Sequence, residues 1–229
     1  MTVRAKICGI RSETDLRIAV EAGADAVGFI SGITHFSEDG LDADEARRLA
    51  SLVPPFVNKV LVTHLEEADA IIALADRIGV DTIQVHGLVS TETLRKVTAA
   101  ANGRTVLRAV HVTGADAIQD AKTAAANCDA VLLDSRTTDR LGGTGRTHDW
   151  SISARIVAEL SSLGCPVVLA GGLTAANVGE AISAVNPFGV DVNSGVEDSN
   201  GDKSPQACGS FVASAHAWSV ATTVPSQQH

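Results

Sequence analysis

The chain repeats one pattern from end to end: short runs of apolar and β-branched residues alternate with longer segments that have the spacing of amphipathic helices. The apolar runs lie at 3–8, 26–30, 57–62, 82–85, 104–110, 130–133, 166–170 and 188–192. Helical spacing is clear at 13–22, 43–52, 67–78, 91–101 and 175–185. This alternation predicts a parallel sheet with its helices outside it.

Eight such repeats in 229 residues predict an α/β protein that forms a single (β/α)8 TIM barrel, a fold that usually takes about 250 residues. An open doubly wound sheet shows the same alternation and is the alternative, although no GxGxxG follows the first apolar run. Ser12, Thr91 and Thr174 are candidate helix N-caps, and Gly23 is placed to end the first helix.

Composition favours one domain with a large core. The hydrophobic share is 45% and no Pro-, Gly- or Ser-rich linker divides the chain, so we expect a barrel over 1–218 and a disordered tail over 219–229. The first residues do not resemble a signal peptide, and no apolar run approaches the roughly 20 residues of a membrane span. We therefore expect a cytoplasmic protein without a membrane partner.

Charge and cysteine spacing exclude other classes. The net charge is −9 and Lys and Arg are not clustered, which argues against a nucleic-acid partner. Cys8, Cys128, Cys165 and Cys208 show no CxxC spacing, so neither a zinc knuckle nor a disulfide framework is predicted.

The segment VLLDSRTTDRLGGTGRTHDW at 131–150 places an acid and a glycine-rich loop directly after an apolar run. The run VLL has the character of a strand buried on both faces, which puts Asp134 where that strand reaches solvent. Gly142, Gly143 and Gly145 allow the backbone to approach an anion closely. Taken alone, these glycines suit an ordinary surface loop equally well.

Active sites of barrels of this type lie at the carboxyl ends of the strands. The residues at those ends are strongly polar: Cys8, Ser31, Thr63, His64, His86, His111, Asp134, Gly171, Gly172, Asn193 and Ser194. Taken alone, Cys8 suits a structural place in the core better than a catalytic one. The turns that hold Gly171 with Gly172 and Ser194 with Gly195 predict a phosphate site across the last two strands, and two tight turns without a ligand are the alternative.

Several motifs, in the same order, resemble the phosphoribosylanthranilate isomerase family of tryptophan biosynthesis. They are KICGI at 6–10, GADAVGF at 23–29, QVHG at 84–87, LLDS, GGTG and DW between 132 and 150, LAGGLTAANV at 169–178 and VDVNSGVE at 190–197. The resemblance implies a cofactor-free enzyme that converts an N-(5-phosphoribosyl)arylamine into a 1-deoxyribulose aminoketose by an Amadori rearrangement. It makes Asp134 the general acid and Cys8 the general base.

These roles require a raised carboxyl pKa and a lowered thiol pKa, relative to reference values of about 3.9 and 8.5. Lys6 shares a strand face with Cys8 and is expected to orient or polarise the site. The residues expected to bind the substrate or its phosphate are Lys6, His86, Arg108, Arg136, Gly143, Gly145, Gly171, Gly172, Asn193, Ser194 and Gly195.

The chain departs from the family pattern after the second strand, where the family usually has an arginine that grips the anthranilate carboxylate and this chain reads SGITHFSEDG. His35, Arg136 and Arg108 are candidate substitutes. Thr63 and His64 stand where the family favours a small Asn-containing turn. Asn193 replaces a usual serine, which a site made of backbone amides should tolerate.

Histidines end three adjacent strands at His64, His86 and His111, and His35 follows a fourth, which raises the hypothesis of a zinc or iron site. Ligand sets of this kind usually include a nearby carboxylate or close HxH spacing, and His86 belongs to the family motif. We therefore expect no metal and assign these residues to orienting the sugar or the aryl acid. The expected partner is a phosphorylated sugar-arylamine, bound by a monomer or a homodimer.

Two other functions stay open: a related sugar-phosphate isomerase or epimerase with another substrate, and a barrel that binds a phosphate ligand without turnover. The presence of both Cys8 and Asp134 favours an enzyme, because a binding protein needs neither an acid nor a base.

Overall fold

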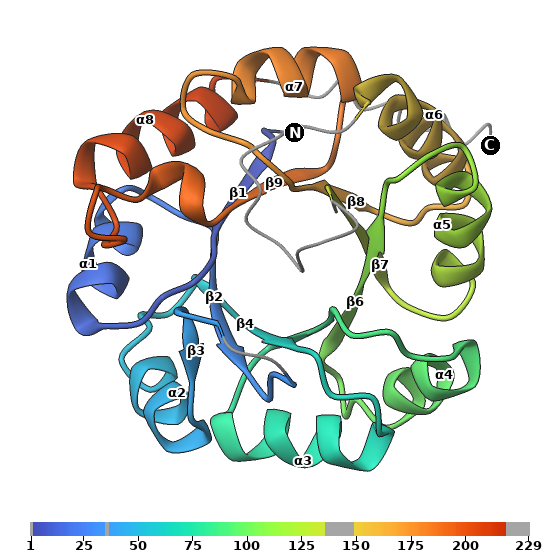
Figure 1. The fold of residues 1–229 in the computed structure, drawn as a ribbon, viewed down its shortest axis with the longest axis horizontal. Helices are drawn as coiled ribbons and strands as arrows, with labels where there is room; N and C mark the ends of the chain where they lie inside the picture. The colour runs from blue at the N-terminus through green and yellow to red at the C-terminus, as the bar shows by residue number, and fades with distance from the viewer. Residues whose placement is uncertain (1, 35–36, 136–148, 219–229) are drawn as a thin grey trace, which may run out of the picture.

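The computed structural model describes residues 2–34, 37–135 and 149–218, and in this part parallel strands form a ring that helices surround (Figure 1). The strands are β1 (Arg4–Ile7), β2 (Ala26–Ser31), β3 (Gly40–Leu41), β4 (Asn58–Thr63), β5 (Thr82–Val85), β6 (Thr105–His111), β7 (Ala130–Asp134), β8 (Val167–Leu169) and β9 (Gly189–Val192). The helices are α1 (Glu13–Glu21), α2 (Ala43–Ala50), α3 (Ala68–Ile78), α4 (Thr91–Ala99), α5 (Ala117–Ala125), α6 (Trp150–Ser161), α7 (Val178–Val185), the 3-10 turn η1 (Ser194–Val196) and α8 (Pro205–His216).

The sheet closes on itself through β1. On one side β1 pairs in parallel with β9, with Arg4 opposite Gly189, and on the other side it pairs in parallel with β2, with Lys6 opposite Ala26. The ring therefore runs β1-β9-β8-β7-β6-β5-β4-β2 and back to β1, which confirms the (β/α)8 barrel and rules out the open doubly wound sheet. The two-residue strand β3, which the sequence analysis did not predict, pairs with the end of β2 outside this ring.

Alternation along the strands divides the core into two parts. One set of side chains points outward and packs against the helices, as the fully buried Val27 and Phe29 of β2 do. The other set points into the barrel, where apolar clusters form on two walls. One cluster contains Leu107, Ala109, Ala130, Leu132 and Ala170, and the other contains Cys8, Val60 and Val62. The inside of the barrel is therefore filled with side chains, and a pocket can open only at an end.

The helix caps follow the sequence signals with two corrections. Ser12 caps α1 as predicted, because its hydroxyl accepts a hydrogen bond from the Asp15 N–H. Ser90 caps α4, and its neighbour Thr91 is already the first helical residue. Helix α7 begins only at Val178, because Thr174 opens a preceding turn in which its hydroxyl oxygen accepts from the Ala176 N–H. The predicted helix over 175–185 is correspondingly shorter.

The two ends of the described chain meet, since the Val3 N–H donates to the Trp218 carbonyl at 3.3 Å. Within the described residues no helix is long and apolar enough to cross a membrane. The predicted tail over 219–229 lies outside the described residues.

Candidate active site

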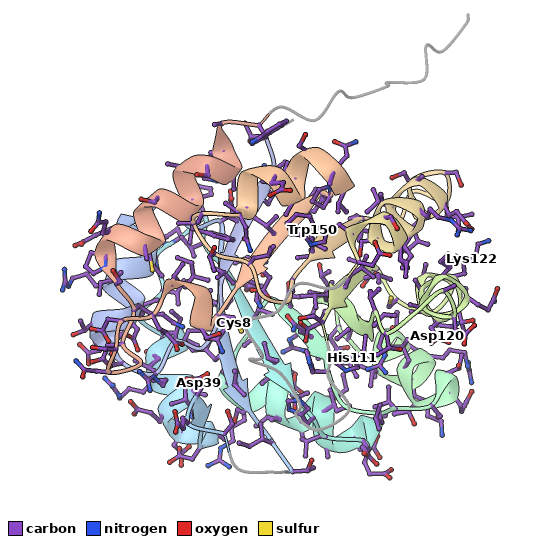
Figure 2. The ribbon with its side chains drawn as sticks, turned by 45° about the horizontal axis from the view of Figure 1, so that its top comes forward. Cys8, Asp39, His111, Asp120, Lys122 and Trp150 are labelled. Atoms are coloured by element: carbon purple, nitrogen blue, oxygen red, sulfur yellow. The ribbon has the colours of Figure 1, made fainter. Side chains whose placement is uncertain are left out.

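A pocket of about 950 Å³ opens at the carboxyl ends of the strands. Its wall includes Cys8 directly after β1, His64 directly after β4, His86 directly after β5 and Asp134 at the end of β7. Figure 2 shows Cys8 and His111 near the middle of the ring, whereas Asp120 and Lys122 lie on its outer side. Most of the polar strand ends predicted from the sequence therefore line one pocket. Ser31 lines another pocket instead, and the fully buried Thr63 donates its hydroxyl to the Gly32 carbonyl.

Cys8 and Asp134 face this pocket from strands that are separated in the ring by β9 and β8. Both residues are largely buried, with 6% and 9% of their surface exposed. A carboxyl group and a thiol on different walls of one pocket can reach different atoms of a single bound molecule.

The pKa values of this pair differ from the sequence-based expectation. Burial raises the pKa of the Cys8 thiol, and the charge of Lys6 offsets this only in part. Burial also favours the neutral form of Asp134, but the hydrogen bond and charge of His86, together with the charge of His111, outweigh burial and hold the pKa of Asp134 below its ordinary value. The expectation of a raised carboxyl pKa and a lowered thiol pKa is therefore wrong.

A buried polar layer forms the floor of the pocket. The Lys6 ammonium donates to Asp191 Oδ2 at 2.9 Å and to Gln84 Oε1 at 3.1 Å, and Gln84 Nε2 lies 3.3 Å from His86 Nδ1. Burial alone would lower the pKa of Lys6, but the Asp191 carboxylate and then Cys8 more than offset it, so that this pKa lies above its ordinary value. Lys6 is among the residues predicted for the site, whereas Gln84 and Asp191 are not. Each of these two residues lies two positions before a polar strand-end residue, and this spacing places both members of the pair on the inner face of the barrel.

Three histidines stand in a row along the ends of β4, β5 and β6. The rings of His64 and His86 lie 5.0 Å apart edge to face, and those of His86 and His111 lie 5.2 Å apart. His86 Nε2 is 3.5 Å and His111 Nδ1 is 4.0 Å from Asp134 Oδ2. His86, His111 and Asp134 thus bring three ligand atoms within 4.8 Å of one another.

These three residues do not fit a metal ion well, because of how Gln84 is oriented. Lys6 has only hydrogen-bond donors, so it must face the amide oxygen of Gln84, which turns the NH2 group toward His86 Nδ1. When the His86 ring is neutral, Nδ1 is then the acceptor and the proton is on Nε2, which faces Asp134. A metal would need that nitrogen without its proton.

The candidate phosphate side of the pocket is built around glycines. Gly171 and Gly172 have φ angles of +86° and +67°, which favour glycine. A Cβ on Gly171 would lie 2.3 Å from the Ser135 nitrogen, and one on Gly195 would lie 1.8 Å from the Leu173 oxygen. Glycine therefore lets the loops after β7, β8 and β9 approach one another, and Gly171, Gly172, Ser194 and Gly195 all line the pocket.

The side chain of Asn193 is held by protein partners at the pocket rim. Its amide nitrogen donates to Asp39 Oδ2 at 2.8 Å, and its amide oxygen accepts from the buried Lys203 ammonium at 2.7 Å. Lys203 also donates to Glu197 at 2.8 Å. Asn193 thus links the loop after β9 to the segment before β3.

The family model described as N-(5'-phosphoribosyl)anthranilate (PRA) isomerase matches residues 5–214. The chain belongs to this isomerase family. Among named relatives, N-(5'-phosphoribosyl)anthranilate isomerase 2 of Methanosarcina mazei is 40% identical over 212 residues, which cover 92% of each chain. The resemblance found in the sequence motifs is therefore confirmed.

Solved structures of PRA isomerases match the fold over nearly the whole chain. The enzyme of Thermotoga maritima has a TM-score of 0.82 and 35% identity, and the match covers 94% of this chain and 100% of that chain. A phosphoribosyl anthranilate isomerase in complex with reduced 1-(o-carboxyphenylamino)-1-deoxyribulose 5-phosphate has a TM-score of 0.78 and 33% identity, over 94% and 100% of the two chains.

Arg108 was expected to bind the substrate, but it lies outside the pocket. It occupies the outward face of β6, and its guanidinium donates to the carbonyls of Val85 at 2.9 Å and Gly87 at 2.6 Å. The described pocket lining does not include it. The alternation of β6 explains this difference, since Leu107 and Ala109 point into the barrel and Arg108 between them points out. Three other expected residues, Arg136, Gly143 and Gly145, and the candidate His35 lie outside the described residues.

Proposed function

We propose that this chain is a cofactor-free isomerase that converts N-(5-phosphoribosyl)anthranilate to 1-(2-carboxyphenylamino)-1-deoxyribulose 5-phosphate in tryptophan biosynthesis. One observation carries the proposal: Cys8 and Asp134 face the same pocket from β1 and β7 in a member of the PRA isomerase family. An Amadori rearrangement needs an acid and a base that act on different atoms of one sugar.

In the proposed mechanism Asp134 donates a proton to the ring oxygen of the ribose. The lone pair of the substrate's aryl nitrogen then forms a C1′=N double bond as the C1′–O bond breaks, which gives an iminium ion and a free hydroxyl group on the opened sugar. Cys8, as a thiolate, removes the proton from C2′, and the electron pair of that bond moves to form an enolamine. Tautomerisation of the enolamine gives the ketone. The Lys6 cation, whose charge favours the thiolate, supports Cys8 in this role.

The phosphate is assigned to the loops after β8 and β9. Gly171 and Gly172 leave the backbone uncovered on one side, and Ser194 and Gly195 supply a hydroxyl and further backbone on the other. Gly143 and Gly145 are assigned to close the site from the loop after β7. Barrels of this class often bind phosphate with the loops after their last two strands, which supports these roles.

The aryl carboxylate is assigned to the histidine side of the pocket. His64 lines the pocket next to His86, and Arg108 is turned away from it. A substrate analogue that carries aniline in place of anthranilate tests this assignment, because it lacks only the carboxylate. We expect His64→Leu to raise KM for the natural substrate about tenfold, corresponding to about 1.4 kcal/mol, and to leave KM for the analogue unchanged. An equal change for both substrates would contradict it.

The proposal includes a cytoplasmic location and a monomer or homodimer. Light scattering of the purified protein measures the oligomeric state directly. A species larger than a dimer would contradict it.

The decisive experiment is turnover of phosphoribosylanthranilate by the purified protein, followed by the loss of anthranilate-type fluorescence with and without a chelator. Efficient turnover that the chelator does not change is the expected result. A folded protein that binds phosphate but does not turn the substrate over would contradict the proposal and favour a related barrel with another substrate. Turnover lost in chelator would contradict the cofactor-free mechanism.

A further inference from the structure

Gln84 lies between Lys6 and His86 in the buried floor of the pocket. Its side chain points into the barrel, 2% of its surface is exposed, and its amide touches Lys6 on one end and His86 on the other. A primary amide has one end that only accepts and one end that only donates. The orientation of this amide therefore decides which neighbour must donate a hydrogen bond to it and which must accept one from it.

Lys6 fixes that orientation. The ammonium group has three donors and no acceptor, and it lies 3.1 Å from Gln84 Oε1. Lys6 is itself held by Asp191 at 2.9 Å, with both side chains buried. Turning the amide over would place two donors against each other in a buried site, which is costly.

The amide then acts on His86. Gln84 Nε2 donates toward His86 Nδ1 at 3.3 Å, so this nitrogen keeps a lone pair and the neutral ring carries its proton on Nε2. Nε2 faces Asp134 Oδ2 at 3.5 Å. A second ring proton on Nδ1 would point at the NH2 group of Gln84, with the Lys6 cation behind it.

We propose that Gln84 is a positioning residue that selects the ring tautomer of His86 with its proton on Nε2, so that His86 presents an N–H group to the Asp134 carboxylate. This inference rests on the proposed function for its catalytic meaning, since the carboxyl group of Asp134 must be held where it meets the ring oxygen of the ribose. In the other tautomer His86 would turn a lone pair toward the carboxylate and would no longer hold it in place.

Other charged and titratable groups lie close by. His64 and His111 each contact the His86 ring, Lys6 contacts Gln84, and Cys8 and Asp191 line the same pocket. His111 contacts the same carboxylate oxygen at 4.0 Å. Gln84 differs from all of them because it is uncharged and touches the far nitrogen of His86.

The test replaces the donor on Nδ1 by an acceptor of the same shape. In Gln84→Glu one carboxylate oxygen can stay with Lys6 while the other accepts a hydrogen bond from His86 Nδ1, which places the proton of the neutral ring on Nδ1 and takes the N–H group away from Asp134. We expect kcat to fall by about 10²-fold, the scale of a lost general acid, with KM changed less than threefold. Gln84→Met removes the donor without adding an acceptor, and we expect a smaller loss of kcat.

The readout that a purely structural role would not move is the 15N NMR spectrum of the His86 ring, assigned by comparison with His86→Asn. For the neutral ring we expect the Nε2–H tautomer in the wild type and a proton on Nδ1 in Gln84→Glu. Gln119→Glu makes the same chemical change on the exposed surface of α5 and should leave both the spectrum and kcat as they are.

Two results would overturn the inference: a neutral wild-type His86 ring that carries its proton on Nδ1, or a folded Gln84→Glu protein with wild-type kcat. The NMR result needs no turnover. If the wild type does not convert phosphoribosylanthranilate but His86 shows the Nε2–H form, the proposed function fails and the placement of the proton stands.

Discussion

The Lys6 ammonium lies 2.9 Å from Asp191 Oδ2, and both side chains are more than nine-tenths buried beneath the pocket. The second carboxylate oxygen of Asp191 is buried without a hydrogen-bond partner among the described residues, and Asp191 lines the pocket. The pair thus supports the floor of the site with its charges matched.

Removing the cation alone should destabilise the protein strongly. Lys6→Met leaves a buried carboxylate without its counter-ion, and such losses cost about 3–5 kcal/mol in free energy of unfolding. The double variant Lys6→Met with Asp191→Leu removes both charges and should recover most of this loss. Urea unfolding of the single and double variants measures the effect. Arg17→Met breaks the exposed pair with Glu21 and serves as the control, with little expected change. Equal stability of Lys6→Met and Arg17→Met would contradict the prediction.

The acid and the base should each be needed for turnover and dispensable for folding. Cys8→Ala and Asp134→Asn are expected to lower kcat by at least about 10²-fold, with circular dichroism unchanged. Cys208→Ala changes another buried cysteine, on α8 away from the described pocket lining, and should keep wild-type kcat. Wild-type turnover in folded Cys8→Ala or Asp134→Asn would show that the assigned roles are wrong.

Glycine should be required at position 171 because a side chain there would clash with Ser135, in addition to the positive φ. Gly79→Ala, at a φ of +80° with open space around the new Cβ, should cost about 1 kcal/mol of strain. Gly171→Ala meets the Ser135 nitrogen at 2.3 Å, so its loss in free energy of unfolding should be clearly larger. We also expect inhibition by inorganic phosphate to weaken in Gly171→Ala and to stay unchanged in Gly79→Ala. Equal effects of both substitutions would contradict the close approach.

Asp25 should make stability depend on pH in the acid range. Partial burial favours its neutral form, but the Ala5 N–H and the His216 and Arg4 side chains outweigh burial and lower the pKa of Asp25. A carboxylate with a folded pKa below the unfolded value of about 3.9 adds stability above that value and loses it as pH falls through the folded pKa. Wild type should therefore exceed Asp25→Asn at pH 6, and the difference should shrink toward pH 3. Urea unfolding at several pH values tests this, and a difference that grows in acid would contradict it.

Much of the fold could be predicted because it depends on patterns of neighbouring residues in the sequence. The alternation of apolar runs with helical segments gave the strands of the ring, and the hydroxyl of Ser12 gave the start of α1. Errors arose where neighbouring signals compete. Ser90 and Thr91 both carry a hydroxyl, and only the backbone geometry selects Ser90 as the cap. The two-residue strand β3 is too short to leave a periodic signal.

The sequence by itself determined the barrel, the family and the presence of Cys8 and Asp134 at strand ends, because these depend on periodicity and on motifs within a few residues. Only the tertiary structure decided that Arg108 faces outward, that Gln84 lies between Lys6 and His86, and that His86 and His111 shift the pKa of Asp134 downward. Gln84 is 78 residues from Lys6 in the chain. Contacts and electric fields of this kind act through space, so they depend on the closure of the ring and on the direction in which each strand turns its side chains.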